Sequence, residues 1–310
     1  MRIAYHLSMS SPRADELDPA VLAALGHLEL VARWTVDGFV NGLHRSPRKG
    51  FSVEFAEHRS YQPGDDLRYL DWRIAARADR WVVKLFEEDT NTRAMLVLDV
   101  SASMQWTGSP TRLTKLAYAE RLASAMGLLL LRQHDAVGLI RFDATLRNVV
   151  PPRSQRAQWR RLMAAFSEPG GGRESNVKEA LMAAGKLVRR PGFVVLFSDL
   201  LTDPTPVADA ARTLRARGHE VLVLHIMDPS ERDFPEEGEA RYRDPESHQE
   251  VPATPGEVRG TYRETVQEAL ADWKAAIGRS GARYALAYTD EPFGRPLRLL
   301  VGVNGRGAMI

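Results

Sequence analysis

The chain has 310 residues, of which 44% are hydrophobic, and this is enough for one large or two small globular domains. Its 42 basic and 40 acidic residues leave a formal net charge of +2, so the composition gives no reason to expect a nucleic-acid or anionic-membrane partner. It contains no cysteine, which excludes disulfides, thiolate metal sites and cysteine nucleophiles.

Residues 1–93 are predicted to form a loose N-terminus, residues 1–17, and an extension, residues 18–93. No apolar run in the first residues suits a signal peptide, and the longest, residues 125–131, is too short for a membrane span, so we expect a cytoplasmic protein without membrane insertion. Asp18-Pro19 is typical of a helix start, and apolar residues at helical spacing predict a helix that stops before Ser46-Pro47. A strand is predicted at 81–86.

From residue 94 to residue 310 the pattern changes to alternating strands and helices. Short apolar runs predict strands at 94–98, 136–140, 146–150, 193–197, 220–226 and 283–288. Helices are predicted at 111–132, 155–166, 177–188, 206–217 and 258–277, with a Pro- and Glu-rich insertion at about 228–256. This alternation is typical of an α/β fold with a mostly parallel sheet covered by helices on both faces.

Two of the predicted strands end in acids, Asp99 and Asp199. Ligands of open parallel sheets gather outside the carboxyl ends of the strands. Asp99 begins the pattern Asp-x-Ser-x-Ser, whose spacing can bring its carboxylate and the hydroxyls of Ser101 and Ser103 around one small volume. These are hard oxygen ligands, suited to Mg²⁺, Mn²⁺ or Ca²⁺, and an open coordination position would attract a partner's carboxylate. The alternative is a serine-rich loop that only caps a helix.

Asp99-x-Ser101-x-Ser103 resembles the metal-ion-dependent adhesion site of von Willebrand factor A domains. The resemblance implies that Asp199 is the family's fourth-strand aspartate. It also implies that Ser175, in the segment 170–176, takes the place of the usual threonine. Ser101, Ser103 and Ser175 would then ligate the metal directly, and the two aspartates mostly through water. The segment departs from the family pattern, because Arg173 and Glu174 separate the glycines from Ser175.

A second resemblance covers nearly the whole chain. Residues 42–47, 55–72, 84–88, 226–229 and 288–290 are similar to the DUF58 family, and the most specific match is RSYQPGDDLRYLDW at 59–72. The resemblance implies a bacterial cytoplasmic protein with a von Willebrand factor A-like core. It also implies that the protein works with a MoxR-type AAA+ ATPase or its client in chaperone-like or complex-assembly roles. The segment from Arg59 to Trp72 could have a structural role, in which paired Asp and Arg side chains attach the N-terminal extension to the core. Alternatively, it could be a surface that binds a partner.

Metal-dependent protein docking, without catalysis, is therefore the first functional hypothesis. A metal-dependent hydrolase or phosphatase using Asp99 and Asp199 is the second, although Ser101 stands where Asp-x-Asp phosphatases have their general acid. A nucleic-acid binder is third. Its one possible signal is a group of basic residues beside Trp159, which we interpret as a solvated helix face, namely Arg153, Arg156, Arg160 and Arg161.

Overall fold

The computed structural model describes residues 28–44, 58–60, 81–84, 92–155, 157–172, 174–233, 240–243, 250–253 and 255–298. The chain divides into two units, residues 46–91 and the remainder. In the smaller unit, β1 (His58–Ser60) and β2 (Val82–Lys84) pair in antiparallel fashion. The strand predicted at 81–86 is confirmed over β2, whereas residues 61–80, with most of the 59–72 match, lie outside the described residues.

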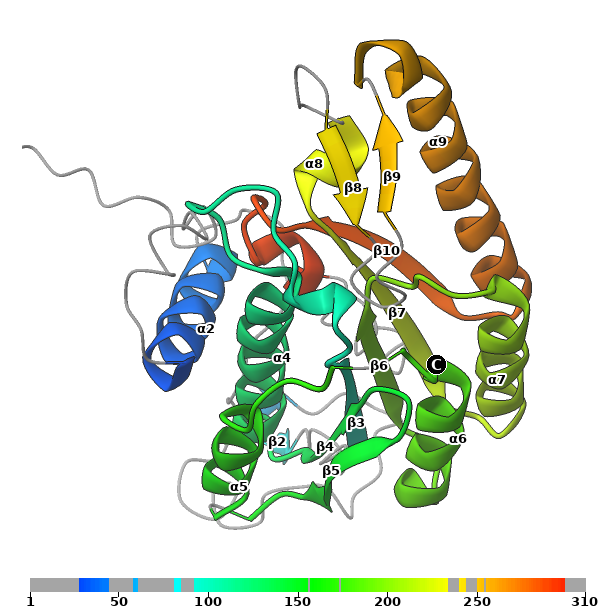
Figure 1. Ribbon diagram of the computed structural model, residues 1–310. Coiled ribbons are helices and arrows are strands. Elements are labelled where there is room, and N and C mark those ends of the chain that lie inside the picture. The colour runs from blue at the N-terminus through cyan, green and yellow to red at the C-terminus, as the bar shows by residue number, and fades with distance from the viewer. Residues whose placement is uncertain are drawn as a thin grey trace, which may run out of the picture. The chain divides into compact units, whose positions relative to one another are not determined.

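The larger unit is built on a six-stranded sheet whose strand order is β10-β7-β6-β3-β4-β5 (Figure 1). All neighbouring strands are parallel except β4 and β5, which follow each other closely in the chain and pair antiparallel. The predicted α/β fold with a mostly parallel sheet is therefore confirmed. The strands are β3 (Arg93–Asp99), β4 (Ala136–Phe142), β5 (Leu146–Arg153), β6 (Phe193–Ser198), β7 (Glu220–Met227) and β10 (Arg283–Tyr288).

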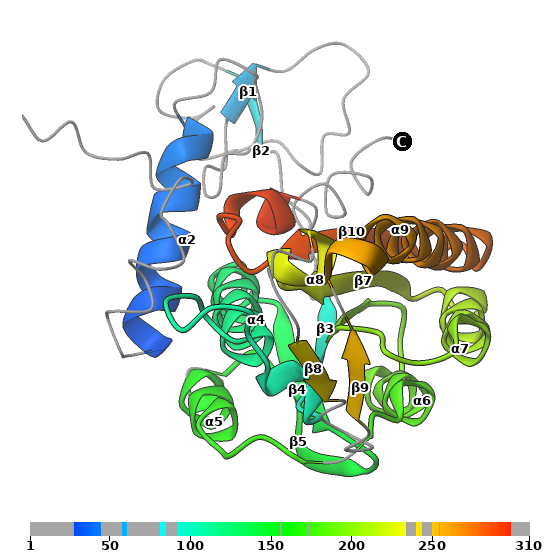
Figure 2. The ribbon, with the colours of Figure 1, turned by 45° about the horizontal axis from the view of Figure 1, so that its top comes forward.

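Helices cover both faces of this sheet, as Figure 2 shows. One face packs against α4 (Lys115–Arg132) and α5 (Ala157–Phe166), and α2 (Leu28–His44) packs on α4. The other face packs against α6 (Val177–Val188), α7 (Pro204–Ala216) and α9 (Pro255–Arg279). Because both faces are covered, the central strands can be apolar along their whole length, which explains their continuous apolar runs.

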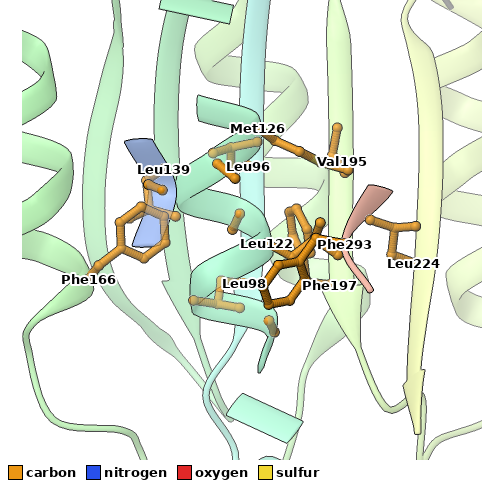
Figure 3. Close-up of a cluster of buried hydrophobic side chains, with 14 of the residues drawn as sticks. Leu96, Leu98, Leu122, Met126, Leu139, Phe166, Val195, Phe197, Leu224 and Phe293 are labelled. Atoms are coloured by element: carbon orange, nitrogen blue, oxygen red, sulfur yellow. The ribbon is translucent and has the colours of Figure 1, made fainter. Parts of the chain in front are cut away.

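The core between α4 and the sheet is made of interlocking aliphatic and aromatic side chains (Figure 3). Leu96 and Leu98 of β3 lie against Leu122 and Met126 of α4, and none of the four is exposed. Phe293, from the segment after β10, closes the same cluster. This packing fixes the start of α4 relative to the end of β3.

Several helix boundaries differ from the predicted ones because capping side chains set them. The helix predicted from residue 111 begins at Lys115, since the Thr114 hydroxyl accepts a hydrogen bond from the Ala117 amide at 3.1 Å. The helix predicted from residue 206 begins at Pro204, after the capping carboxylate of Asp203. Both differences lie within the first turn, where sequence patterns are weakest.

The segment predicted as an insertion at 228–256 contains regular structure. It holds a short helix, α8 (Pro229–Asp233), and an antiparallel hairpin of β8 (Ala240–Arg243) and β9 (Glu250–Ala253). Asp228 is fully buried, accepts from Arg112 Nη2 at 2.8 Å and contacts Thr289 Oγ1 at 3.2 Å. Asp228, at the beginning of this segment, therefore belongs to the core, and α9 begins at Pro255, within the bounds predicted for the insertion.

Asp135, at the entrance to β4, makes stability depend on pH. It is 2% exposed, and its Oδ1 accepts from the Thr92 amide at 3.1 Å. Burial raises its pKa from 3.8 to about 7. Because the folded protein holds this proton more tightly than the unfolded chain, the free energy of unfolding falls as pH rises from about 4 towards 7.

We predict that Asp135→Asn removes this pH-dependent decrease in the free energy of unfolding. The amide oxygen of the asparagine side chain should still accept the hydrogen bond from the Thr92 amide. Urea denaturation at pH 5 and pH 8 measures the effect as a difference between the variant and the wild type. The advantage of the variant should be larger at pH 8. An equal difference at the two pH values would contradict the prediction.

Candidate functional site

The carboxyl ends of β3 and β6 meet where the order of the sheet reverses. From β3 the chain continues through α4 to β4 on one side, whereas β6 lies on the other side of β3. Ligands of open α/β sheets bind at such a switch point, because the loops after the two strands leave a crevice between them. Asp99 ends β3 and Asp199 directly follows β6, so the fold brings both predicted acids to this point.

The Asp99 carboxylate is completely buried and accepts three hydrogen bonds. Its Oδ2 accepts from Ser175 Oγ at 2.6 Å and from Ser198 Oγ at 2.7 Å, and its Oδ1 accepts from the Ser101 amide at 3.0 Å. Burial, and then the charge of Asp199, raises the pKa of Asp99 to about 6. The structure therefore places Ser175 beside Asp99, and it adds Ser198, a hydroxyl that sequence reasoning did not select.

The serine hydroxyls of the Asp-x-Ser-x-Ser pattern lie together. Ser101 and Ser103 are both buried, and their Oγ atoms are 3.2 Å apart. A short 3-10 helix, η3 (Ser103–Gln105), begins at the second serine and turns the chain towards α4. The two hydroxyls of the pattern are therefore neighbours, and this loop meets the Asp99 carboxylate through the Ser101 amide, whereas a metal held between them stays a prediction.

The segment that carries Ser175 packs tightly against its neighbours. Gln105 Nε2 donates to the carbonyl oxygen of Gly171 at 2.7 Å, and the Asn176 amide donates to the carbonyl oxygen of Asp143 at 2.9 Å. A Cβ atom on Gly171 would lie only 2.2 Å from Asp143 Oδ2. The close approach of Asp143 explains why glycine stands at position 171.

A buried lysine that sequence reasoning missed lies beside Asp199. The Lys115 side chain is 1% exposed, and its Nζ lies 2.8 Å from Asp199 Oδ2 and 2.5 Å from Glu231 Oε1. Burial disfavours the charge of Lys115, but the two carboxylates outweigh burial and hold its pKa above the usual value. The sequence pattern did not reveal this lysine, because the helix is predicted from residue 111, and only the observed start at Lys115 places the cation in the first turn, where it opposes the helix dipole.

The oxygen donors of the candidate site are of the chemical type that binds a hard divalent cation. Asp99 and Asp199 supply carboxylates, and Ser101, Ser103 and Ser175 supply hydroxyls, all of which are oxygen ligands that Mg²⁺ accepts. Within the described ranges, no three His, Cys, Asp or Glu side chains gather in a way that could hold a metal. A cation here would therefore depend on the serine hydroxyls as well as on the acids.

The surroundings of the site combine exposed apolar side chains with a strained backbone. Trp106, just after η3, is 39% exposed, and Leu201, in the loop after β6, is 61% exposed. Leu200 has a φ of 53°, a left-handed conformation that costs about 1–3 kcal/mol for such a residue. Bonds from the Leu200 amide to Ser198 Oγ and from the Thr202 amide to the Leu200 carbonyl hold it in place. Strain of this kind concentrates at functional sites.

The basic residues beside Trp159, which are predicted to form a solvated helix face, lie in and just before α5 and not in the strand-end loops that form the site. Arg153, Arg160 and Arg161 are exposed, and Arg156 lies outside the described residues. In the part of the chain that the structure describes, no helix is both long enough and apolar enough to cross a membrane.

A family model described as "Protein of unknown function DUF58" matches residues 57–272. Two similar proteins are the uncharacterized proteins Mb1516 of Mycobacterium bovis and Rv1480 of Mycobacterium tuberculosis. Each is 30% identical over 302 residues, which cover 96% of this chain and 94% of the relative.

Solved structures with a related shape include an aerotolerance-related membrane protein from Bacteroides fragilis, with a TM-score of 0.49 and 16% identity, covering 68% of this chain and 98% of that one. BatB from Bacteroides thetaiotaomicron has a TM-score of 0.45 and 18% identity, covering 69% and 98%. The von Willebrand factor A domain of SpRpn10 has a TM-score of 0.41 and 9% identity, covering 66% and 92%.

We predict that Lys115→Met lowers the free energy of unfolding by about 3–5 kcal/mol, because it leaves the Asp199 and Glu231 carboxylates without their buried counter-ion. The double variant Lys115→Met/Asp199→Asn should recover about 0.5–3 kcal/mol of that loss, because it also removes one of the two charges. Urea denaturation of the wild type, both single variants and the double variant measures this coupling. Strictly additive effects would show that the two side chains do not interact.

Proposed function

The chain belongs to the DUF58 family and has a von Willebrand factor A-like α/β fold, and from this premise we propose that it is a metal-dependent protein-docking module. The single observation that supports the proposal most strongly is the convergence of hydroxyl and carboxylate oxygens at the switch point of the sheet. Ser175, 76 residues away in the chain, donates to Asp99 at 2.6 Å. A loop that only caps a helix would not need a hydroxyl from a distant segment.

The residues divide into direct ligands and charge partners. The hydroxyls of Ser101, Ser103 and Ser175 would hold Mg²⁺, or Mn²⁺ or Ca²⁺, directly. Asp99 and Asp199 would balance its charge, and Ser198 would keep the Asp99 carboxylate in position through its bond to Oδ2. When bound, the cation supplies an electrophilic open position for a partner's carboxylate. Trp106 and Leu201 add exposed apolar area near that position, which suits contact with another protein.

The proposed partner is a MoxR-type AAA+ ATPase or a client of that ATPase, in a chaperone-like or complex-assembly role. This part of the proposal rests on family membership, because the site geometry indicates an acidic group on the partner but not which protein carries it. If the cation bridges the two proteins, the affinity for the partner depends on metal, and the affinity for metal depends equally on the partner.

The test combines metal binding with partner binding. Calorimetric titration with Mn²⁺ and affinity capture of the MoxR-type ATPase from the same organism would compare wild type, Asp99→Ala and the control Asp209→Ala, each with Mg²⁺ and with EDTA. Asp209 is an exposed acid of α7, so its loss should change neither measurement. We expect EDTA and Asp99→Ala each to weaken capture by about 5- to 150-fold. A folded Asp99→Ala protein that captures the ATPase as well as wild type, with or without metal, would contradict the proposal.

A further inference from the structure

A cavity of about 370 Å³ opens beside Asp199. It lies among the segment that follows β6, the end of β7, helix α8 and one face of α9. Strand β3, which carries the Asp99 loop, lies on the other side of β6 in the sheet. Its volume is in the range of cavities that bind small molecules or single side chains. The residues that decide its chemistry are Asp199, Leu201, Glu231, Tyr262, Leu270 and Trp273.

The charged part of this cavity has a net negative formal charge. Asp199 and Glu231 line it with two carboxylates, and the single ammonium of Lys115 contacts both. Among the described residues that line the cavity there is no lysine or arginine. His225 also lines it, and its Nδ1 lies 2.7 Å from the Tyr284 hydroxyl. These three groups, Asp199, Glu231 and Lys115, therefore carry a net formal charge of −1.

Asp199, which lines this cavity, has a buried carboxylate oxygen without a partner among the described residues. Asp199 is 3% exposed, Lys115 faces its Oδ2, and its Oδ1 has no hydrogen-bond partner among the described residues. Leaving such an acceptor unpaired costs about 1–3 kcal/mol or more when the group is charged. A ligand that brings a donor to Oδ1 would recover that free energy.

The remaining walls are apolar and aromatic. Leu201 and Leu270 are aliphatic, and Tyr262 and Trp273 present aromatic rings. Lysine and arginine side chains bury an apolar stem while a charged head binds an acid, and aromatic rings favour cations as neighbours. The combination of apolar walls and an acidic end is complementary to such a side chain.

We infer that this cavity binds one lysine or arginine side chain of a partner protein, with the cationic head at Asp199 and the aliphatic stem against α9. The inference goes beyond the proposed function, because it requires no divalent cation and assigns a basic residue to the partner. Since Asp199 is common to both sites, the test is performed in EDTA, where its result does not depend on metal binding.

The test is a titration of the full-length protein carrying ¹³C-methyl methionine. Met227 lines the cavity, and Met227→Leu identifies its resonance. The probes are the N-acetyl methylamides of lysine, arginine and norleucine, the last having an aliphatic side chain without charge. We expect the lysine and arginine probes to shift the Met227 resonance saturably, with at least tenfold higher affinity than norleucine. Equal affinities for all three, or no saturable shift with any, would overturn the inference.

A matched pair of helix variants tests the location. Ala269 is exposed and lines the cavity, so Ala269→Phe narrows it without disturbing the core. Gln267 is exposed on the same helix and does not line it, so Gln267→Phe is the control. Ala269→Phe should weaken binding of the lysine probe at least tenfold, and Gln267→Phe should leave it unchanged. Wild-type affinity in Ala269→Phe would place the probe elsewhere and overturn the inference.

Discussion

The hydrogen bonds to the buried carboxylate of Asp99 hold together the segments on which the rest of the site depends. Ser175 comes from the loop before α6, Ser198 from the end of β6, and the Ser101 amide from the turn after β3. A buried carboxylate is stable only when its acceptor positions are paired, so these segments keep a fixed arrangement. The position of the site therefore follows from the position of one acid at the end of the central strand.

The charges around this acid explain why the site can exist within a folded core. Asp99 and Asp199 lie close enough for the charge of Asp199 to raise the pKa of Asp99. Lys115 pairs with Asp199 and Glu231, which limits the repulsion between the acids. A divalent cation would join a cluster that already contains one cationic group. Its affinity would consequently reflect competition with the Lys115 ammonium for Asp199.

The fold and the two acids could be predicted because they depend on local patterns. The apolar runs of β3 and β6 indicate buried parallel strands, and an acid at the end of each indicates the ligand edge of the sheet. The Asp-x-Ser-x-Ser spacing lies within one turn of chain, so the sequence could predict that the hydroxyls of Ser101 and Ser103 lie together. The hydrogen bond from Ser175 to Asp99 agrees in position with the family resemblance, whereas its role as a metal ligand stays a prediction.

Lys115, Ser198 and Glu231 could not be found in this way, because their roles arise from contacts between distant segments. Lys115 meets Glu231 across 116 residues of chain, inside a stretch that composition indicated as an insertion. Proline and glutamate content describes solvent exposure on average, but it does not reveal which acid turns inward to meet a buried cation. Capping hydroxyls and carboxylates likewise set helix starts that apolar periodicity leaves uncertain by several residues.

The most direct measurement of the central claim is anomalous diffraction from crystals of the protein grown with Mn²⁺. The geometry predicts an anomalous peak between Asp99 and the hydroxyls of Ser101, Ser103 and Ser175, at coordination distance from the serine oxygens. A peak at that position would establish the strand-end site as a metal centre. Crystals that contain Mn²⁺ elsewhere, with no peak there and with Asp99 still bonded only to its serine donors, would contradict it.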